Sequence, residues 1–282
     1  DVAAMGFDVV GLANNQTLNY GLDGLAQTIE LLGAHGVRHV GAGADAEAAW
    51  APELVSGGGV RAALLACTCV APPEWAATET RGGLAALRVR TAYEVDARWE
   101  REEPGVAPRV RTWIEDDELA RARDAVARAA AQADAVLVAV HWGVGASAAR
   151  ADYQEQLAGV LVAAGATCVL GGHPPAPQGL ALRDGALVSY GQGTFVRQQP
   201  RAPELAALYA AMPRAGALLR LRLAPDGGAA AALLPALLGE RERAGLAAGR
   251  EAAAVLDEIL ARSDLGGAAP EVRDGALELA IR

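Results

Sequence analysis

Short, uniformly apolar runs along the chain alternate with segments in which apolar residues recur at helical spacing. The runs Ala135–Val140 and Thr167–Leu170 show no polar alternation, which is typical of strands covered on both faces. Between them, Tyr153, Leu157 and Leu161 recur at every fourth position, which predicts a helix. The pattern predicts a strand, a helix and a second strand, with both strands ending at one edge of a sheet.

The same order of elements is predicted nearer the amino terminus. Phe7–Ala13 is an apolar strand that ends in a polar turn containing Asn15. A helix with Leu25 on its apolar face follows, and the short strand Val37–Val40 comes after it. Val60–Val70 is predicted as the next strand. Polar side chains therefore follow the ends of several strands, at the edge where open α/β sheets bind ligands.

Downstream of the second histidine, the pattern changes to antiparallel pairs. The predicted elements are the hairpin strands Leu180–Leu182 with Ala186–Tyr190, the hairpin strands Ala217–Leu223 with Ala229–Leu234, the helix Arg250–Arg262 and the strand Ala276–Ile281. Hairpins that follow strand-helix-strand units predict a mixed sheet or two stacked sheets.

The chain is expected to form one main domain over residues 1–240, followed by a C-terminal helix and strand in residues 241–282. Residues 71–115 differ from their surroundings, because they combine Pro72-Pro73 with a run rich in Arg and Glu around Trp99. We interpret this segment as a long insertion. It is either a lid over a substrate or a solvated excursion pinned to the domain by its aromatic residues.

Composition excludes several classes of function. The formal net charge is −9, and the 25 basic residues are all arginine and are scattered, which argues against nucleic acid as a partner. The lack of lysine excludes a Schiff-base or P-loop lysine. Cys67, Cys69 and Cys168 lie in apolar strands, which predicts reduced, buried thiols.

No apolar run is long enough to predict a transmembrane segment. The chain begins at Asp1 without a methionine, so it could be a fragment that has lost an upstream leader. The chain alone predicts a cytoplasmic protein, whereas a missing leader would predict a protein associated with the cell envelope.

His141 and His173 are the candidate functional histidines, because each follows a predicted strand. Either one alone could be an ordinary buried histidine bonded to a backbone carbonyl. Together with the polar turn at Asn15 they predict a site. His35 and His39 are interpreted as structural, since neither lies at the carboxyl end of a predicted strand. A serine hydrolase is excluded, because the sequence has no Gly-x-Ser-x-Gly elbow.

Five ordered blocks resemble a known family. They are GFDVVGLANNQTLNYGLDGL, HVGAG, VAVHWG, VLGGHPPAPQG and VSYGQGTFV, within residues 6–70 and 134–196. They resemble the CapA family of capsule and poly-γ-glutamate synthesis proteins, whose fold is similar to that of the calcineurin-like metallophosphatases. The resemblance implies an α/β fold, a metallophosphatase-like α/β/β/α sandwich of mixed sheets, here lacking its N-terminal strand.

The resemblance also implies a metal site at the strand ends. Asn15, His141 and His173 match positions that hold one divalent metal in metallophosphatase-like sites, and the expected cofactor is Mn²⁺ or Zn²⁺, as one ion or none. Catalytic positions are implied for His141 and Gln16, and substrate-binding positions for Asn14, Gln192 and Thr194.

Two departures from the family pattern weaken this implied site. The family's Asn-Asn-His reads Asn14-Asn15-Gln16, and an amide donates a hydrogen bond but does not transfer a proton at neutral pH. The family's His-Pro-His reads His173-Pro174-Pro175, so a ligand of a second metal is lost. We therefore expect a mononuclear or vacant site rather than a two-metal centre.

Two functions remain open at this stage. One is a metal-dependent hydrolase of capsule or poly-γ-glutamate biosynthesis, acting on an anionic polymer or a phosphoester beside other capsule-synthesis proteins. The other is a non-catalytic scaffold or polymer-binding member of the family. Arg197, Arg201 and Arg214 could meet a carboxylate-rich polymer if they converge, although solvated surface arginines are the simpler interpretation.

Overall fold

The computed structural model describes residues 2–103, 105–145, 147–195, 212–239 and 244–281. Its largest sheet has six strands in the order β11-β12-β10-β9-β5-β4. They are β4 Glu53–Gly57, β5 Val60–Thr68, β9 Ala135–His141, β10 Cys168–Gly172, β11 Pro177–Arg183 and β12 Ala186–Gln192. The four central strands are parallel, and the two edge strands are antiparallel to their neighbours.

Two helices cover one face of this sheet. They are α4 Asp116–Ala130 and α5 Asp152–Ala163, and their apolar sides form a core with alternate residues of β9, such as Val136 and Val138. Leu157 of α5 is fully buried in this core. Because the other residues of β9 face the opposite side of the sheet, its sequence is apolar without alternation, as predicted.

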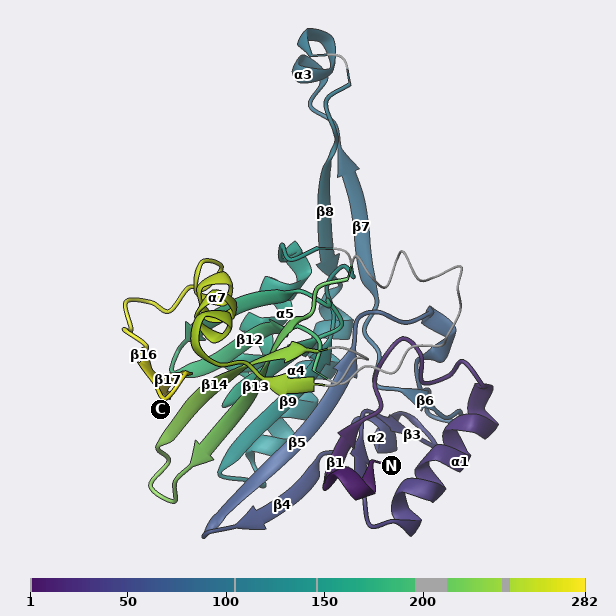
Figure 1. Cartoon of the computed structure of the whole chain (residues 1–282). Coiled ribbons are helices and arrows are strands. Elements are labelled where there is room, and N and C mark those ends of the chain that lie inside the picture. Colours follow the sequence, from purple (N-terminus) through teal and green to yellow (C-terminus); the bar gives the residue numbers. More distant parts are fainter. Residues whose placement is uncertain (1, 104, 146, 196–211, 240–243, 282) are drawn as a thin grey trace.

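A second sheet packs against the other face. It has the order β13-β14-β17-β16, and β15 pairs with β14. Its elements are β13 Ala215–Leu223, β14 Ala229–Leu238, β15 Ala244–Leu246, β16 Glu271–Arg273 and β17 Ala276–Ile281. Leu187 of the first sheet and Leu277 of the second share one core with Ile259 of α7, which spans Gly249–Leu260 (Figure 1).

The amino-terminal residues form a smaller unit beside the large sheet (Figure 1). Strand β1 pairs in parallel with β2, and β3 pairs with β6. The unit consists of η1 Ala3–Met5, β1 Val9–Gly11, α1 Gly21–Ala34, β2 Arg38–Val40, β3 Ala42–Gly43, α2 Ala46–Ala49, η2 Pro73–Trp75 and β6 Gly83–Leu84. Ala13, Val40 and Ala66 pack together and join this unit to β5.

Part of segment 71–115 projects from the body as a two-stranded arm (Figure 1). The arm consists of β7 Val89–Glu94 and β8 Arg109–Ile114, with the short helix α3 Ala97–Glu102 at its tip. The earlier part of the segment packs into the body, where Leu84 and Leu87 are buried.

The predicted mixed α/β fold is confirmed, and so are both hairpins and the parallel strands. All three cysteines are free thiols, as predicted, and Cys67 and Cys168 are buried, whereas Cys69 follows the end of β5 and is only half-buried. The division at residue 240 stays a prediction, although β17 pairs with β14 inside the second sheet. Among the described residues, no helix has both the length and the apolar character required to cross a bilayer.

Candidate functional site

The two candidate histidines meet at the carboxyl edge of the large sheet. His141 is the last residue of β9, and its partner in the parallel ladder is Gly172, which ends β10. His173 follows immediately, and the two imidazole rings lie 4.7 Å apart between centroids. The sequence places each histidine at a strand end, and the adjacency of the strands brings the rings into contact.

The polar turn after β1 brings a third side chain to this pair. The Oδ1 atom of Asn15 lies 3.2 Å from Nε2 of His141. The turn itself is held by local hydrogen bonds, since Asn14 Oδ1 accepts from the backbone N–H of Gln16 at 2.8 Å. The Thr17 hydroxyl donates to the carbonyl of Leu12. These bonds limit the positions that Asn15 can adopt.

His173 has an unusual backbone and an unpartnered ring nitrogen. Its φ is +98°, in a region that favours glycine and is costly for residues with a Cβ. Its Nδ1 atom is buried and has no hydrogen-bond partner among the described residues. A buried polar atom without a partner costs about 1–3 kcal/mol. Strain and an orphaned donor or acceptor at one residue indicate a functional position.

His141 is neutral at physiological pH. Burial, with a smaller contribution from the neighbouring His173, lowers the pKa of its imidazole to about 4. A neutral imidazole retains a lone pair, which is the form that binds a metal ion. His141 therefore has the protonation state of a ligand rather than of a cation.

Both histidines open onto a cleft of about 640 Å³. It is lined by Gly11, Ala13, Asn14, Asn15, Gln16, Ala66, Ala139, Val140, His141, Leu170, Gly171, Gly172, His173, Gln192 and Gly193. No carboxylate and no arginine is among these lining residues, so the ionisable groups of the described cleft are the two histidines. Amides supply the other polar side chains.

One pair of donor atoms has the spacing expected for two ligands of a single divalent ion. A distance of 3.2 Å between Asn15 Oδ1 and His141 Nε2 is close to the roughly 3.4 Å that separates neighbouring ligand atoms around tetrahedral zinc. The Nδ1 atom of His173, whose ring contacts that of His141, has no hydrogen-bond partner among the described residues. The described residues contain no group of three His, Cys, Asp or Glu suited to a metal. An ion here would rest on two imidazoles and one amide.

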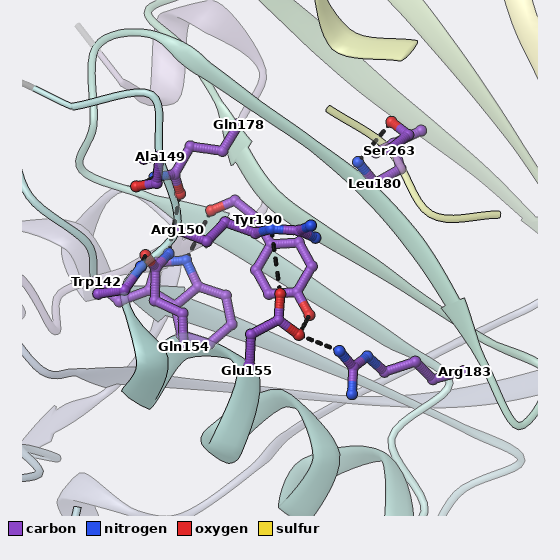
Figure 2. A network of polar contacts seen from close by, with 11 residues as sticks. Trp142, Ala149, Arg150, Gln154, Glu155, Gln178, Leu180, Arg183, Tyr190 and Ser263 are labelled. Carbon is purple, nitrogen blue, oxygen red and sulfur yellow. Dashed lines mark hydrogen bonds and ion pairs between the residues drawn. The ribbon is translucent and has the colours of Figure 1, made fainter. Parts of the chain in front are cut away.

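Buried hydrogen bonds hold the segment that follows His141. The backbone N–H of Gly143 donates to the Tyr153 hydroxyl. Gln154 of α5 donates to Gln178 Oε1 at 2.9 Å, and Gln178 donates in turn to the Ala149 carbonyl at 3.0 Å (Figure 2). Both glutamine side chains are fully buried. The amide pair therefore fixes the loop between β9 and α5 against the sheet.

A cluster of ion pairs and hydrogen bonds around Glu155 links the same loop and helix α5 to β11 and β12. Its carboxylate accepts from the Tyr190 hydroxyl at 2.7 Å and pairs with Arg150 at 3.1 Å and with Arg183 (Figure 2). The guanidinium of Arg150 also lies 4.5 Å from the centre of the Tyr190 ring. Four segments are joined through one carboxylate.

Sequence reasoning did not find these supporting residues. The hydrogen bonds of Gln154, Gln178 and Tyr190 join residues 24 to 35 positions apart, so no local motif marks them. One sequence feature could have indicated the close packing around the site, namely the glycines in the five family blocks. A Cβ on Gly171 would lie 2.2 Å from the Tyr190 carbonyl, which means that only glycine fits there.

The structure gathers most of the predicted site residues. Asn14, Gln16 and Gln192 line the same cleft as the proposed metal ligands, and Thr194 is not among its lining residues. The roles predicted for all of them stay predictions. Arg197 and Arg201 lie outside the described residues. Arg214 donates to the Leu238 carbonyl at 2.6 Å.

Comparison with known proteins identifies the family. The sequence matches the bacterial capsule synthesis protein family, PGA_cap, over residues 1–199. The chain belongs to this family. The predicted membership of the CapA family is thereby confirmed, and the matched residues include the strand ends that hold His141 and His173.

Curated relatives share this family character. A probable polyglutamine synthesis accessory protein of Mycobacterium tuberculosis is 28% identical over 235 residues, which are 77% of this chain and 54% of the relative. The PGA biosynthesis protein CapA of Bacillus subtilis is 28% identical over 198 residues, 69% of this chain and 44% of the relative. The capsule biosynthesis protein CapA of Bacillus anthracis is 27% identical, covering 70% and 42%. The chain spans about half or less of the length of these relatives.

Proposed function

We propose that this protein acts in the biosynthesis of a capsule or poly-γ-glutamate polymer, as a hydrolase that depends on one divalent metal ion. The names of the relatives support the pathway. One observation supports the chemistry: His173 is held at a positive φ with a buried, unpartnered ring nitrogen beside the neutral His141. Both features lower the stability of the fold, so a residue with a purely structural role would not be expected to have them.

Asn15, His141 and His173 would hold the ion, and either Mn²⁺ or Zn²⁺ suits two imidazoles and an amide oxygen. When bound, such an ion supplies Lewis acidity and lowers the pKa of a coordinated water. Gln16 lies exposed at the cleft, where its amide can donate a hydrogen bond to an anionic oxygen. It does not transfer a proton, so protonation of a leaving group depends on solvent.

The lining of the cleft favours an anionic substrate. No carboxylate lines it among the described residues, so an approaching carboxylate or phosphoryl group meets no like charge. Asn14, Gln16 and Gln192 offer amide N–H groups, which bind such oxygens without adding a fixed positive charge. The candidate substrates are therefore γ-glutamyl polymers and phosphoesters.

The test is the metal content of the purified chain, measured by mass spectrometry and by calorimetric titration with Zn²⁺ and Mn²⁺. We expect close to one ion per chain in the wild type and loss of that ion in the double variant His141→Ala, His173→Ala. The control is His39→Ala on β2, a histidine that does not line the cleft. Absence of bound metal from wild type and variant alike would contradict the proposal.

A second candidate is a non-catalytic member that binds the polymer. Its supporting observation is that the described cleft has amide donors but no ionisable side chain other than the two histidines. Hydrolysis of phosphoesters or γ-glutamyl amides that stops on addition of chelator would favour the hydrolase. Polymer binding that persists in chelator, without hydrolysis, would favour the second candidate.

A further inference from the structure

The projecting arm has one apolar face and one charged face. The pairing of β7 with β8 sets Tyr93 opposite Val110 and Glu94 opposite Arg109. Residues opposite each other in an antiparallel ribbon share a face, and alternate residues share it too. One face therefore presents Val89, Thr91, Tyr93, Val110, Thr112 and Ile114, and the other presents Arg90, Ala92, Glu94, Arg109, Arg111 and Trp113.

The base of the arm is fixed to the body. Ile114 is 1% exposed and belongs to the main core. Its backbone N–H donates to the Gln156 side chain of α5 at 2.8 Å, and Arg111 pairs with Asp152 at 3.2 Å. The direction of the arm is therefore set by the domain, and its apolar face begins in the core and runs outward.

The outer half of the apolar face is uncovered. Tyr93 is 70% exposed, Val110 is 53% exposed and Val95 is 54% exposed. At the tip, Trp99 and Val106 are exposed as well. Single exposed apolar residues are common on protein surfaces, but a contiguous group usually marks an interaction site. A two-stranded ribbon is also marginal in water without a surface to pack against.

The charges of the arm identify the partner that fits it. Residues 89–114 contain five arginines and five acidic residues, so the arm is neutral, and the rest of the chain has the whole net charge of −9. Near the tip, charges of both signs lack an ion-pair partner within the described part of the chain: Glu100, Arg101, Glu102, Glu103 and Arg109. A strongly acidic or basic partner would leave charges of one sign unpaired.

We infer that the arm is a contact between two copies of this chain. In this contact the apolar faces around Tyr93 and Val110 pack against each other across a two-fold axis. The same patch serves both copies in such a contact, and because each arm carries free charges of both signs, an acidic residue of one copy can lie opposite an arginine of the other. Because the arm projects, the two negatively charged bodies stay apart and repel each other little (Figure 1).

Sedimentation equilibrium of the whole chain, from about 1 µM to about 100 µM, tests this inference, because a contact of modest area gives a dissociation constant in that range. We expect a reversible monomer–dimer equilibrium. In the double variant Tyr93→Thr, Val110→Thr, the dissociation constant should rise at least about tenfold, because threonine keeps the strand propensity but removes apolar area. The matched control is Val272→Thr, a valine of β16 that is 61% exposed and lies outside the arm.

Cross-linking locates the contact. Under mild oxidation, Val110→Cys should give a disulfide-linked dimer, whereas Val272→Cys should not. A chain that stays monomeric at every concentration would overturn the inference, and so would a dimer whose affinity the double variant leaves unchanged. Circular dichroism of each variant shows whether it folds. The metal content of the cleft does not depend on the outcome, so this test and that of the proposed function fail separately.

Discussion

At the scale of single residues, His173 provides a direct test of strain at the site. Its φ of +98° favours glycine, so His173→Gly should raise the free energy of unfolding by about 1 kcal/mol in chelator, while abolishing metal binding. His173→Ala is the matched control, because it removes the imidazole but keeps the Cβ. Chemical denaturation measures the first effect and calorimetry the second. If the glycine variant were less stable than the alanine variant, the conclusion that the backbone at residue 173 is strained would be wrong.

The sequence predicts where the two histidines lie, but it does not predict their backbone conformation or their hydrogen-bond partners. An apolar run that ends in a polar residue suffices to place His141 and His173 at strand ends, because the carboxyl edge follows from the strand direction. The positive φ of His173 is a feature of the folded backbone that an apolar run ending before a histidine does not indicate. The roles of Gln154 and Gln178 were not predicted either, because each side chain forms its hydrogen bond with a residue that is distant in the sequence.

At the scale of elements, the loop after β9 links the Gln154 amide to His173. Gly143 has a φ of +84°, and a Cβ at that position would lie 2.8 Å from Pro174, the residue after His173. Gly143→Ala should therefore lower the free energy of unfolding by about 1–3 kcal/mol and weaken metal binding. The matched control is Gly159→Ala within α5, where a Cβ meets nothing within 4 Å.

The control should behave in the opposite sense. Alanine in a helix interior stabilises by about 0.5–1 kcal/mol relative to glycine, and Gly159 lies away from the cleft. Urea denaturation and metal titration of the two variants separate the effects. If Gly143→Ala keeps wild-type metal affinity, then the loop does not position His173.

Uniformly apolar strands were predictable as elements, whereas the arm was not. Segment 71–115 was interpreted as an insertion that could be a lid, and none of its residues lines the described cleft. The alternation of Thr91, Tyr93 and Val95 with charged or small residues is a strand signal of period two. This strand pattern is hard to recognise among the many Arg and Glu residues. A ribbon that no other layer covers has polar residues at most of its positions.

At the scale of the whole molecule, the C-terminal residues share a core with the large sheet. Leu277 of β17 is fully buried and packs with Leu187 and Ile259. Leu277→Ala should lower the free energy of unfolding by about 2–5 kcal/mol, because it leaves a cavity between the sheets. The control is Val272→Ala on the neighbouring β16, where 61% exposure predicts a change below about 0.5 kcal/mol.

Cooperativity decides whether residues 241–282 form a unit of their own. Trp142 is fully buried on the helix-covered face of the large sheet, away from the second sheet. If both sheets unfold together, Leu277→Ala should shift the fluorescence transition, to which Trp142 contributes, and the circular dichroism transition to the same lower urea concentration. If the C-terminal residues unfold alone, the dichroism transition should move while the fluorescence transition stays in place. Since β17 pairs with β14 along five residues of the second sheet, we expect the two transitions to coincide.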